Sequence, residues 1–290
     1  MSEYAIADIG SNTVVLIIYE MQDGRPAVRF HDSRPVHLID YVHDGIMDKE
    51  GIIRTQKVLF EYKDKALECG VTVMHADITE PCRIENVQEL VDALAETGFV
   101  IHPLTGYEEA ACDFYGSRLS VADIKDGIAF DVGGGSTELI SFADGEIIDA
   151  MSFHLGCVRL AHLPLDTPEC RKEIELAAAQ YPSLKTVCSH LVGIGGTCRY
   201  ASFVCDTLYQ TGSVMPVAKL RKIFEDIQAN DPLATAAFLK RVDPARRKVF
   251  LPGLHMILEI ADFYQAETIH YSDTGIREGF LLHYVIGNES

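Results

Sequence analysis

The stretch Phe130-Asp131-Val132-Gly133-Gly134-Gly135-Ser136-Thr137-Glu138-Leu139 joins two apolar runs, which predicts a tight connection between two β-strands. Three consecutive glycines let a backbone approach a ligand closely and adopt positive φ. Successive N–H groups in such a turn form a concave nest for anionic oxygens, and Ser136 and Thr137 add hydroxyl donors. The flanking carboxylates of Asp131 and Glu138 indicate a divalent cation between the charges. We therefore interpret the stretch as a phosphate loop; the alternative is a flexible glycine turn.

The same pattern opens the chain. Asp8-Ile9-Gly10-Ser11-Asn12-Thr13 lies between two further apolar runs and again predicts strand, turn and strand. Two such units predict two half-domains, each of which offers a phosphate loop to one cleft. The repetition is more specific than either loop alone.

The composition excludes several classes of function. The net charge of −18 argues against general affinity for nucleic acid, which needs a basic surface. No apolar run approaches the roughly 18–20 residues of a membrane span. The chain start has no basic region typical of an export signal, and the eight cysteines form no CxxC pair. We expect a cytoplasmic protein with reduced thiols.

Residues 219–248 form a basic island on this acidic chain, with eight basic side chains against four acidic ones. Such an island is either a solvated helix face or a landing site for a polyanion.

Strand-like and helix-like patterns alternate along the chain, which predicts an α/β fold. We expect a first domain of residues 1–117, completed by a C-terminal helix of about residues 280–290, and a second domain of residues 118–279. Between the two loops, Thr105-Gly106-Tyr107-Glu108-Glu109-Ala110 follows a predicted strand and begins a helix. Glu108 there either caps the helix or accepts a proton from an attacking water.

Two further turns follow strands. Gly193-Ile194-Gly195-Gly196-Thr197 leads from a short strand into a helix, a geometry that presents backbone N–H groups to phosphate. Ser272-Asp273-Thr274-Gly275-Ile276-Arg277-Glu278-Gly279 follows the last strand. Arg277 in this turn pairs either with an acid such as Glu278 or with a substrate phosphate.

These five motifs, in this order, resemble the exopolyphosphatase / guanosine pentaphosphate phosphohydrolase family, and the resemblance spans residues 4 to about 285. It implies two actin-like (sugar-kinase-like, ribonuclease H-type) α/β domains with the active site in the cleft between them, in the short form without extra helical domains. It also implies hydrolysis of a terminal phosphate with Mg²⁺ or Mn²⁺ as cofactor.

The resemblance also assigns roles to residues. Glu108 matches the glutamate that activates water, and Glu138 matches a second essential acid. Asp8, Asp131 and Glu138 match residues at the metal. The substrate-binding residues are then the backbone and side chains of the glycine turns together with two arginines: Gly10, Ser11, Asn12, Thr13, Arg83, Gly133, Gly134, Gly135, Ser136, Thr137, Gly195, Gly196 and Arg277.

One segment departs from the family pattern. The run from Ala76 to Asn86 retains Thr79 and Arg83, but Asp77, Glu80 and Glu85 add negative charge. If Arg83 holds the next phosphate of the substrate, these acids should weaken binding of long polyanions.

We expect an exopolyphosphatase that acts on inorganic polyphosphate, with a guanosine pentaphosphate 5′-phosphohydrolase as the alternative. A kinase of the same fold would also need two phosphate loops, but the sequence offers no pocket for a second substrate. A non-catalytic sensor of guanosine tetra- or pentaphosphate is a further alternative, against which the intact Glu108 and Glu138 argue. A homodimer stays open, because the helices expected to be buried exceed what the basic island needs.

Overall fold

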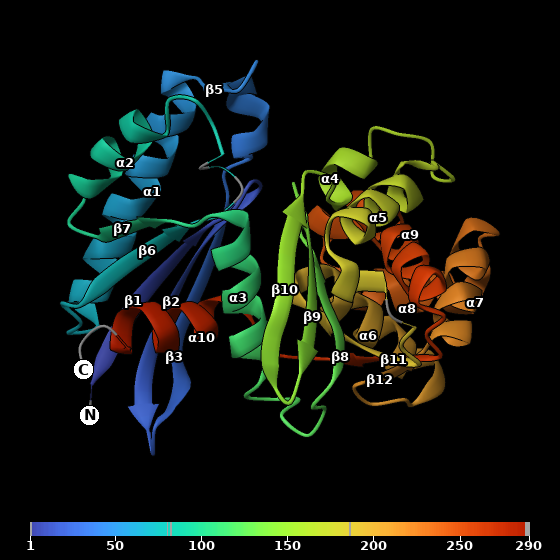
Figure 1. The fold of residues 1–290 in the computed structure, drawn as a ribbon. Coiled ribbons are helices and arrows are strands. Elements are labelled where there is room, and N and C mark those ends of the chain that lie inside the picture. The colour runs from blue at the N-terminus through green and yellow to red at the C-terminus, as the bar shows by residue number, and fades with distance from the viewer. Residues whose placement is uncertain (1, 80, 82, 186, 288–290) are drawn as a thin grey trace. The chain divides into compact units, whose positions relative to one another are not determined.

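The computed structural model describes residues 2–79, 81, 83–185 and 187–287. Helices and strands alternate, which confirms the predicted α/β class (Figure 1). The chain divides into two compact units, one of residues 1–108 and 280–290 and the other of residues 109–279. The sequence placed this boundary at residue 117, the end of helix α3 (Gly106–Ser117). The division falls earlier because Ala110 and Phe114 of α3 pack on the sheet of the second unit.

The first unit is built on a five-stranded sheet with the order β3-β2-β1-β6-β7. The first three strands are antiparallel, and β6 and β7 run parallel to β1. In chain order its elements are β1 (Glu3–Ile9), β2 (Thr13–Gln22), β3 (Arg25–Pro35), the 3-10 helix η1 (Leu38–Tyr41), β4 (Val42–His43), β5 (Ile46–Met47), α1 (Lys49–Glu68), β6 (Met74–Ile78), α2 (Val87–Ala95), β7 (Val100–Pro103) and the first turn of α3.

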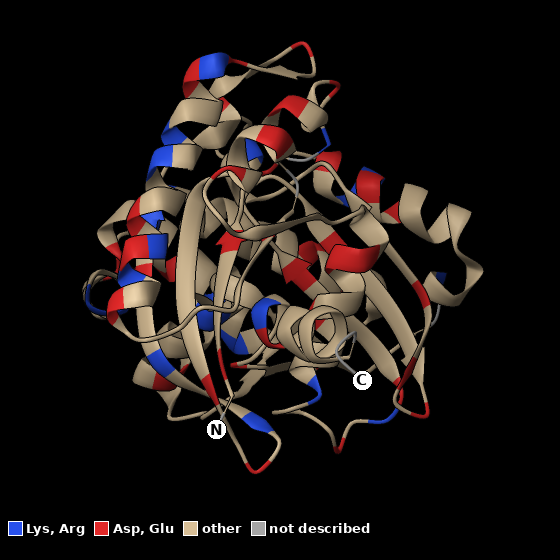
Figure 2. Ribbon diagram, turned by 90° about the vertical axis from the view of Figure 1, so that its left-hand side faces the viewer, with Lys and Arg blue, Asp and Glu red and all other residues tan. Residues whose placement is uncertain are grey.

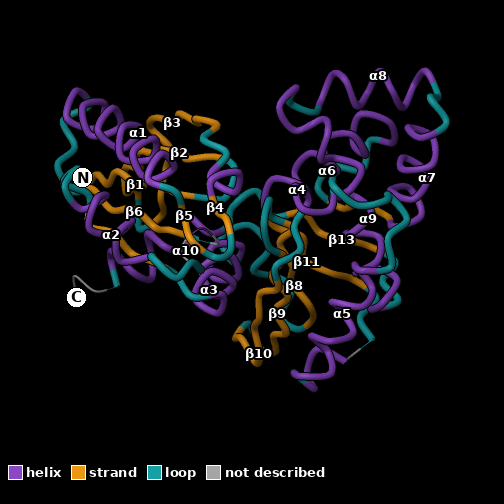
Figure 3. The backbone as a smooth tube through the Cα atoms, turned by 90° about the horizontal axis from the view of Figure 1, so that it is seen from above, coloured by secondary structure: helices purple, strands orange, loops and turns teal. Residues whose placement is uncertain are grey.

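Helices α1 and α2 cover one face of this sheet (Figures 1 and 3). Leu59 and Tyr62 of α1 and Leu90 of α2 are fully buried against alternate residues of β1, such as Ala7. The period of two in the strand and of about 3.6 in the helices explains why these positions share one core.

The second unit has a six-stranded sheet with the order β10-β9-β8-β11-β13-β12. In chain order its elements are the rest of α3, β8 (Gly127–Val132), β9 (Thr137–Ala143), β10 (Glu146–Phe153), α4 (Cys157–Leu160), α5 (Glu169–Gln180), the 3-10 helix η3 (Pro182–Lys185), β11 (His190–Ile194), α6 (Gly195–Tyr209), β12 (Val214–Pro216), α7 (Val217–Gln228), α8 (Pro232–Arg241), the 3-10 helix η4 (Pro244–Arg246), α9 (Arg247–Tyr264), β13 (Thr268–Tyr271) and α10 (Ile276–Phe280).

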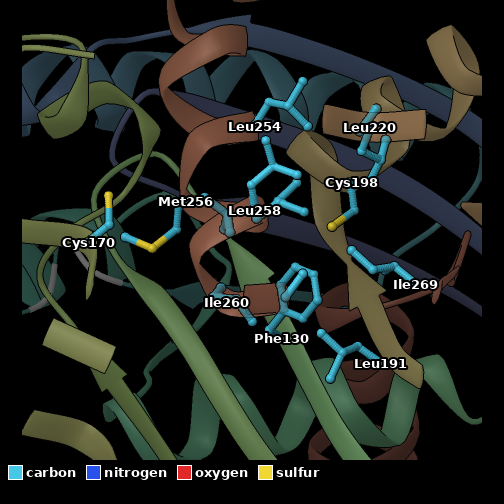
Figure 4. Packing of buried hydrophobic residues seen from close by; sticks show 14 of the residues in the cluster. Phe130, Cys170, Leu191, Cys198, Leu220, Leu254, Met256, Leu258, Ile260 and Ile269 are labelled. Carbon is cyan, nitrogen blue, oxygen red and sulfur yellow. The ribbon is translucent and has the colours of Figure 1, made fainter. Parts of the chain in front are cut away.

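The main core of the second unit lies between its sheet and helix α9. Phe130, Leu191 and Ile269 project from three neighbouring strands toward Leu254 and Leu258 of α9 (Figure 4). The part of this helix from Gly253 to Phe263 is apolar nearly all round, and seven of its eleven residues are buried, as such a pattern predicts.

Both sheets repeat one plan: three antiparallel strands joined by short turns, followed by two strands parallel to the first. The internal repeat inferred from the two glycine loops therefore extends to strand order. This duplicated order is that of the actin-like, ribonuclease H-type fold that the sequence predicted.

The C-terminal helix begins earlier than the sequence predicted. Helix α10 starts at Ile276 and continues as a π-helix, η5 (Leu281–Ile286), and residues 288–290 lie outside the described part of the chain. Within the described residues no helix has the length and apolar character needed to cross a membrane.

Helix α3 packs backbone to backbone against the segment that follows β13. A Cβ atom on Gly116 would overlap the carbonyl oxygen of Gly275, and one on Gly279 would overlap the carbonyl of Cys112. Two glycines thus allow a helix and a second backbone segment to approach more closely than side chains permit.

We expect Gly116→Ala to lower the free energy of unfolding by about 3 kcal/mol or more, because the obstructing atoms belong to the backbone and cannot rotate away. Chemical denaturation monitored by circular dichroism measures this change. Gly196→Ala is the control for stability, because a Cβ there meets nothing within 4 Å. Equal stability of the two variants would contradict the close packing of α3.

Candidate active site

The two glycine loops close by the same hydrogen bond. In the first unit the Gly10 N–H donates to the Thr13 carbonyl at 3.1 Å, and in the second the Gly133 N–H donates to the Ser136 carbonyl at 3.0 Å. Each loop follows the first strand of its antiparallel triplet, β1 or β8. The resemblance of the two sequence motifs thus reflects one backbone conformation.

The carbonyl groups of the second loop accept backbone hydrogen bonds from a single neighbouring segment. Gly133 accepts from the Cys157 N–H at 2.9 Å, Gly134 from Val158 at 2.9 Å and Gly135 from Gly156 at 3.2 Å. The three donors are consecutive residues at the start of α4. A Cβ on Gly156 would overlap the Gly134 carbonyl, so this contact requires glycine.

The first loop is held in the same manner. The Asn12 carbonyl accepts from the N–H groups of Val36 and His37, both at 3.0 Å, and the Ser11 carbonyl accepts from Ile39 at 3.0 Å. In both units the donors come from the segment directly after the third strand of the sheet. The carbonyl dipoles are therefore turned toward that segment and away from the opposite side of each loop.

This arrangement leaves backbone donors for an anion. Among the described residues, the N–H groups of Gly134 and Gly135 donate to no protein group. Ser136 is 3 % exposed and Thr137 is fully buried, with its hydroxyl donated to the Leu155 carbonyl at 2.7 Å. The predicted hydroxyl role therefore applies to Ser136 better than to Thr137, whose hydroxyl holds the loop in place.

Asp131 and Glu138 are direct partners in the β8–β9 ladder, so their side chains lie on the same face of the sheet. Glu138 is 1 % exposed, and one of its oxygens accepts from the Ser152 hydroxyl at 2.6 Å. Two like charges directly opposite each other are destabilising in a bare sheet. The pair is therefore a natural place for a bound cation.

The third glycine turn lies against the carboxylate of Asp131, and Gly195 makes this close approach possible. Its φ is +75°, and a Cβ atom at this position would overlap both carboxylate oxygens of Asp131. Helix α6 begins at Gly195, and its N-terminal end favours negative charge. Thr197 anchors the turn by donating its hydroxyl to the Val132 carbonyl at 2.6 Å. The second unit thus gathers Asp131, Glu138 and both glycine turns at one end of the sheet.

The donor set fits Mg²⁺ or Mn²⁺. Within the described residues no group of three or more His, Cys, Asp and Glu side chains is arranged to hold a metal ion. Mg²⁺ commonly binds proteins through one or two carboxylates, with water and substrate phosphates completing its coordination. Asp131 and Glu138 supply such a pair. Asp8 lies in the first unit, and its role at the metal stays a prediction.

Glu108 caps helix α3. The Thr105 N–H donates to its carboxylate at 2.8 Å, and the Glu108 N–H donates to the Thr105 hydroxyl at 3.2 Å, which is a reciprocal capping box. Burial raises the pKa of Glu108, but the hydrogen bonds from Thr105 and from the Tyr284 hydroxyl lower it by more. The net pKa lies below the usual value, so Glu108 is ionised at neutral pH. Its capping role is confirmed, and its catalytic role stays a prediction.

The atypical segment places one of its acids inside the protein. Asp77 is fully buried in β6, where it is the register partner of Asp8 on β1. Its charge therefore acts within the sheet rather than on a surface that meets a polyanion. Glu85 is exposed beside the Gly45 turn, Arg83 is half-buried, and Glu80 lies outside the described residues.

Arg277 lies in α10 of the second unit and is half-buried. Its neighbour Glu278 accepts from the Gly275 N–H at 2.9 Å and so caps this helix. The predicted contact of Arg277 with phosphate stays a prediction.

Several side chains of the basic island form ion pairs or ring contacts with nearby residues. Elsewhere on the ribbon, Lys and Arg are interspersed with Asp and Glu (Figure 2). Arg221 pairs with Asp262 at 2.6 Å, Lys222 pairs with Asp226 at 2.9 Å, and Lys219 lies 4.6 Å from the centre of the Tyr209 ring. These contacts favour a solvated helix face over a landing site for a polyanion.

Two residues at the second loop were not predicted from sequence. Gly156 holds the Gly135 carbonyl, and Arg159 donates to the same oxygen through Nε at 3.0 Å. The sequence Leu155-Gly156-Cys157-Val158-Arg159 reads as a plain turn, and only its contact with a loop more than twenty residues away reveals its role. The single available signal was a glycine three residues after the end of a strand.

Comparison with known proteins gives one consistent result. Residues 17–286 match the model of the Ppx/GppA phosphatase family. Exopolyphosphatase 2 of Mycobacterium tuberculosis is 26% identical over 296 residues, which cover 90% of each chain. Guanosine-5'-triphosphate,3'-diphosphate pyrophosphatase of Pseudoalteromonas atlantica is 22% identical over 96% of this chain and 58% of its own length.

The solved structures agree on the fold. A crystal structure of the Aquifex aeolicus member of the Ppx/GppA family superposes with a TM-score of 0.81 at 24% identity, and covers 100% of this chain and 99% of its own. The match of a family model to nearly the whole chain confirms the resemblance inferred from the five sequence motifs. The chain belongs to the Ppx/GppA phosphatase family.

Proposed function

We propose that this chain is an exopolyphosphatase, which hydrolyses the terminal phosphate of inorganic polyphosphate with Mg²⁺ or Mn²⁺ as cofactor. Family membership makes the chain a hydrolase of phosphoanhydride bonds. The choice of polyphosphate over other phosphoanhydrides is the proposal. The cytoplasm is the setting that we propose, because the seven described cysteines are all free thiols.

The observation that supports the proposal best is the duplicated loop, in which the carbonyl groups accept hydrogen bonds from the segment after the third strand. A polyphosphate end offers equivalent anionic oxygens and no base or sugar, so recognition by backbone N–H groups is sufficient. Gly134 and Gly135 supply such groups in the second unit. The loop of residues 10–13 has the same closure, and we assign it the same task in the first unit.

The reaction is an in-line displacement at phosphorus. The oxygen of a water molecule bonds to the terminal phosphorus, the bond to the bridging oxygen breaks, and the shortened chain leaves with that oxygen. Glu108 accepts a hydrogen bond from the water and then its proton. Such transition states are loose, so positioning and charge stabilisation supply most of the rate enhancement. A carboxylate with a lowered pKa is a weak base, which suits orientation of the water more than early proton removal.

Asp131 and Glu138 would hold the divalent cation, which neutralises developing charge on the phosphate oxygens when it is bound. The Ser152 hydroxyl donates to one Glu138 oxygen and so orients the carboxylate. Gly195 keeps the adjacent turn close to Asp131 without a side chain in the way.

Guanosine pentaphosphate presents a similar terminal phosphate, and a sensor would bind such nucleotides without turnover. The fold also suits a kinase. The four candidate functions, namely exopolyphosphatase, guanosine pentaphosphate phosphohydrolase, nucleotide sensor and kinase, give different measurable products.

We expect purified protein with Mg²⁺ to release phosphate from polyphosphate faster than from guanosine pentaphosphate or ATP at equal concentrations of terminal groups. Colorimetric phosphate detection, without any acceptor substrate, measures the rates. Release from guanosine pentaphosphate alone would assign the chain to that substrate. Tight nucleotide binding without release would favour the sensor, and phosphate transfer that requires an acceptor would favour the kinase.

We expect Glu108→Gln to lower kcat on polyphosphate by roughly 10² to 10⁴, the usual contribution of a general base, while substrate binding changes little. Glutamine cannot take up a proton from water, although it still accepts the hydrogen bond from the Thr105 N–H. Steady-state kinetics and calorimetric binding of short polyphosphate separate the two effects. Near-normal turnover by this variant would remove Glu108 as the base.

We expect Asp131→Asn and Glu138→Gln to raise the Mg²⁺ concentration for half-maximal activity by roughly 10- to 100-fold or more, because each removes a charged metal ligand. Electron paramagnetic resonance of bound Mn²⁺ gives a readout independent of turnover. Glu146→Gln is the matched control, since Glu146 is an exposed acid at the start of β10. A metal requirement equal to that of the control would exclude the two carboxylates as ligands.

A further inference from the structure

The last helical segment of the first unit is wound as a π-helix. η5 (Leu281–Ile286) follows α10 directly and carries Tyr284 in its middle. π-Helical turns are rare and occur frequently at functional sites. The side chains of this segment were not among those that the sequence singled out.

A row of rings attaches η5 to the sheet. The ring of Tyr284 stacks on that of Phe280 at 5.7 Å with 20° between their planes. Phe280, which is fully buried, meets His102 of β7 edge-on at 5.1 Å. His102 in turn shares a hydrogen bond with His75 of β6 at 3.0 Å between ring nitrogens. Burial lowers the pKa of His102, so this ring is neutral at neutral pH and packs against Phe280 without a charge.

Tyr284, at the other end of this row of rings, contacts Glu108. The Tyr284 hydroxyl donates a hydrogen bond to the Glu108 carboxylate. Thr105 donates to the same carboxylate from the beginning of α3, at 2.8 Å to Oε2. The carboxylate is therefore held by donors from two segments that are distant in sequence, and both segments belong to the first unit.

We propose that Tyr284 is a positioning residue for Glu108 in the hydrolytic reaction. This inference rests on the proposed function of Glu108 as the group that orients water. A glutamate side chain has several rotatable bonds, and one capping contact alone leaves the carboxylate able to rotate. A second donor, mounted on a stack of rings, removes that freedom before substrate binds. The capping box alone would suffice to begin a helix, so the Tyr284 contact is explained by a need to fix the carboxylate.

Tyr284→Phe tests the proposal, because it removes the hydroxyl and keeps the stacked ring. We expect kcat on polyphosphate to fall about tenfold, the effect of one lost hydrogen bond to a charged group, with KM little changed. The hydroxyl stabilises the ionised form, so its removal raises the pKa of Glu108. The acid limb of the kcat–pH profile should therefore move to higher pH. A purely structural role would lower thermal stability without moving this limb.

Two controls isolate the contact. Tyr115→Phe removes another phenol that donates to a carboxylate, Glu146 at 3.4 Å, and should leave the pH profile unchanged. Combining Tyr284→Phe with Glu108→Gln should add little to the loss caused by Glu108→Gln alone, because Tyr284 acts through Glu108. Independent, multiplying losses in the double variant would overturn the proposal.

A measurement without turnover separates this inference from the proposed function. Carboxyl ¹³C NMR of the full chain, with Glu108 assigned from the Glu108→Gln spectrum, follows the titration of Glu108 directly. A higher pKa in Tyr284→Phe than in the parent and Tyr115→Phe proteins supports the contact. An unchanged pKa overturns the inference, even if the enzyme acts on polyphosphate. Full activity of Glu108→Gln would instead refute the role of Glu108, whatever the NMR titration shows.

Discussion

The central constraint in this protein is the direction in which the carbonyl groups of the two glycine loops point. A nest of N–H groups attracts an anion only if the carbonyl dipoles that alternate with them point elsewhere. In the second unit the amides of Gly156, Cys157 and Val158 take up three consecutive carbonyls. The segment after β3 donates in the same way to two carbonyls of the first loop, those of Ser11 and Asn12. Each antiparallel triplet of strands therefore positions not only a loop but also the short segment that polarises it.

This arrangement would allow an acidic protein to act on a polyanion, as we propose for this chain. With a net charge of −18, long-range attraction to phosphate is unfavourable. In the proposed function, recognition would rely on fixed dipoles at short range, together with the proposed divalent cation. The basic island does not change this conclusion, because several of its side chains already pair with acids or aromatic rings. In the same proposal, the Asp131–Glu138 pair would hold a cation that the substrate phosphates would also contact.

Local sequence predicted the loops well and their supports poorly. The loop of residues 131–138 was identified because glycine, hydroxyl and acid side chains occur at adjacent positions and need no long-range information. Gly195 was found from the order of strand, glycine and helix, but the close approach of its backbone to Asp131 depends on the pairing of β8 with β11. Arg159 was missed for the same reason, because its bond to the Gly135 carbonyl exists only once β10 has returned beside the loop. The π-helical turn at Leu281–Ile286 has an ordinary helical pattern in sequence, so the segment was predicted as a plain helix from Phe280.

Glu108 shows why a capping residue and a reactive residue need not be alternatives. The capping box places its carboxylate at the N-terminal end of α3, where both the helix dipole and the hydrogen bonds favour the ionised form. This stabilisation makes Glu108 a weaker base than an unperturbed glutamate. In a loose phosphoryl transfer the attacking water loses its proton late, so a weak base that is always ionised and held in one orientation loses little. A stronger base would be protonated for part of the time and would then fail to orient the water. The same hydrogen bonds that begin the helix therefore favour, rather than oppose, a role for Glu108 in hydrolysis.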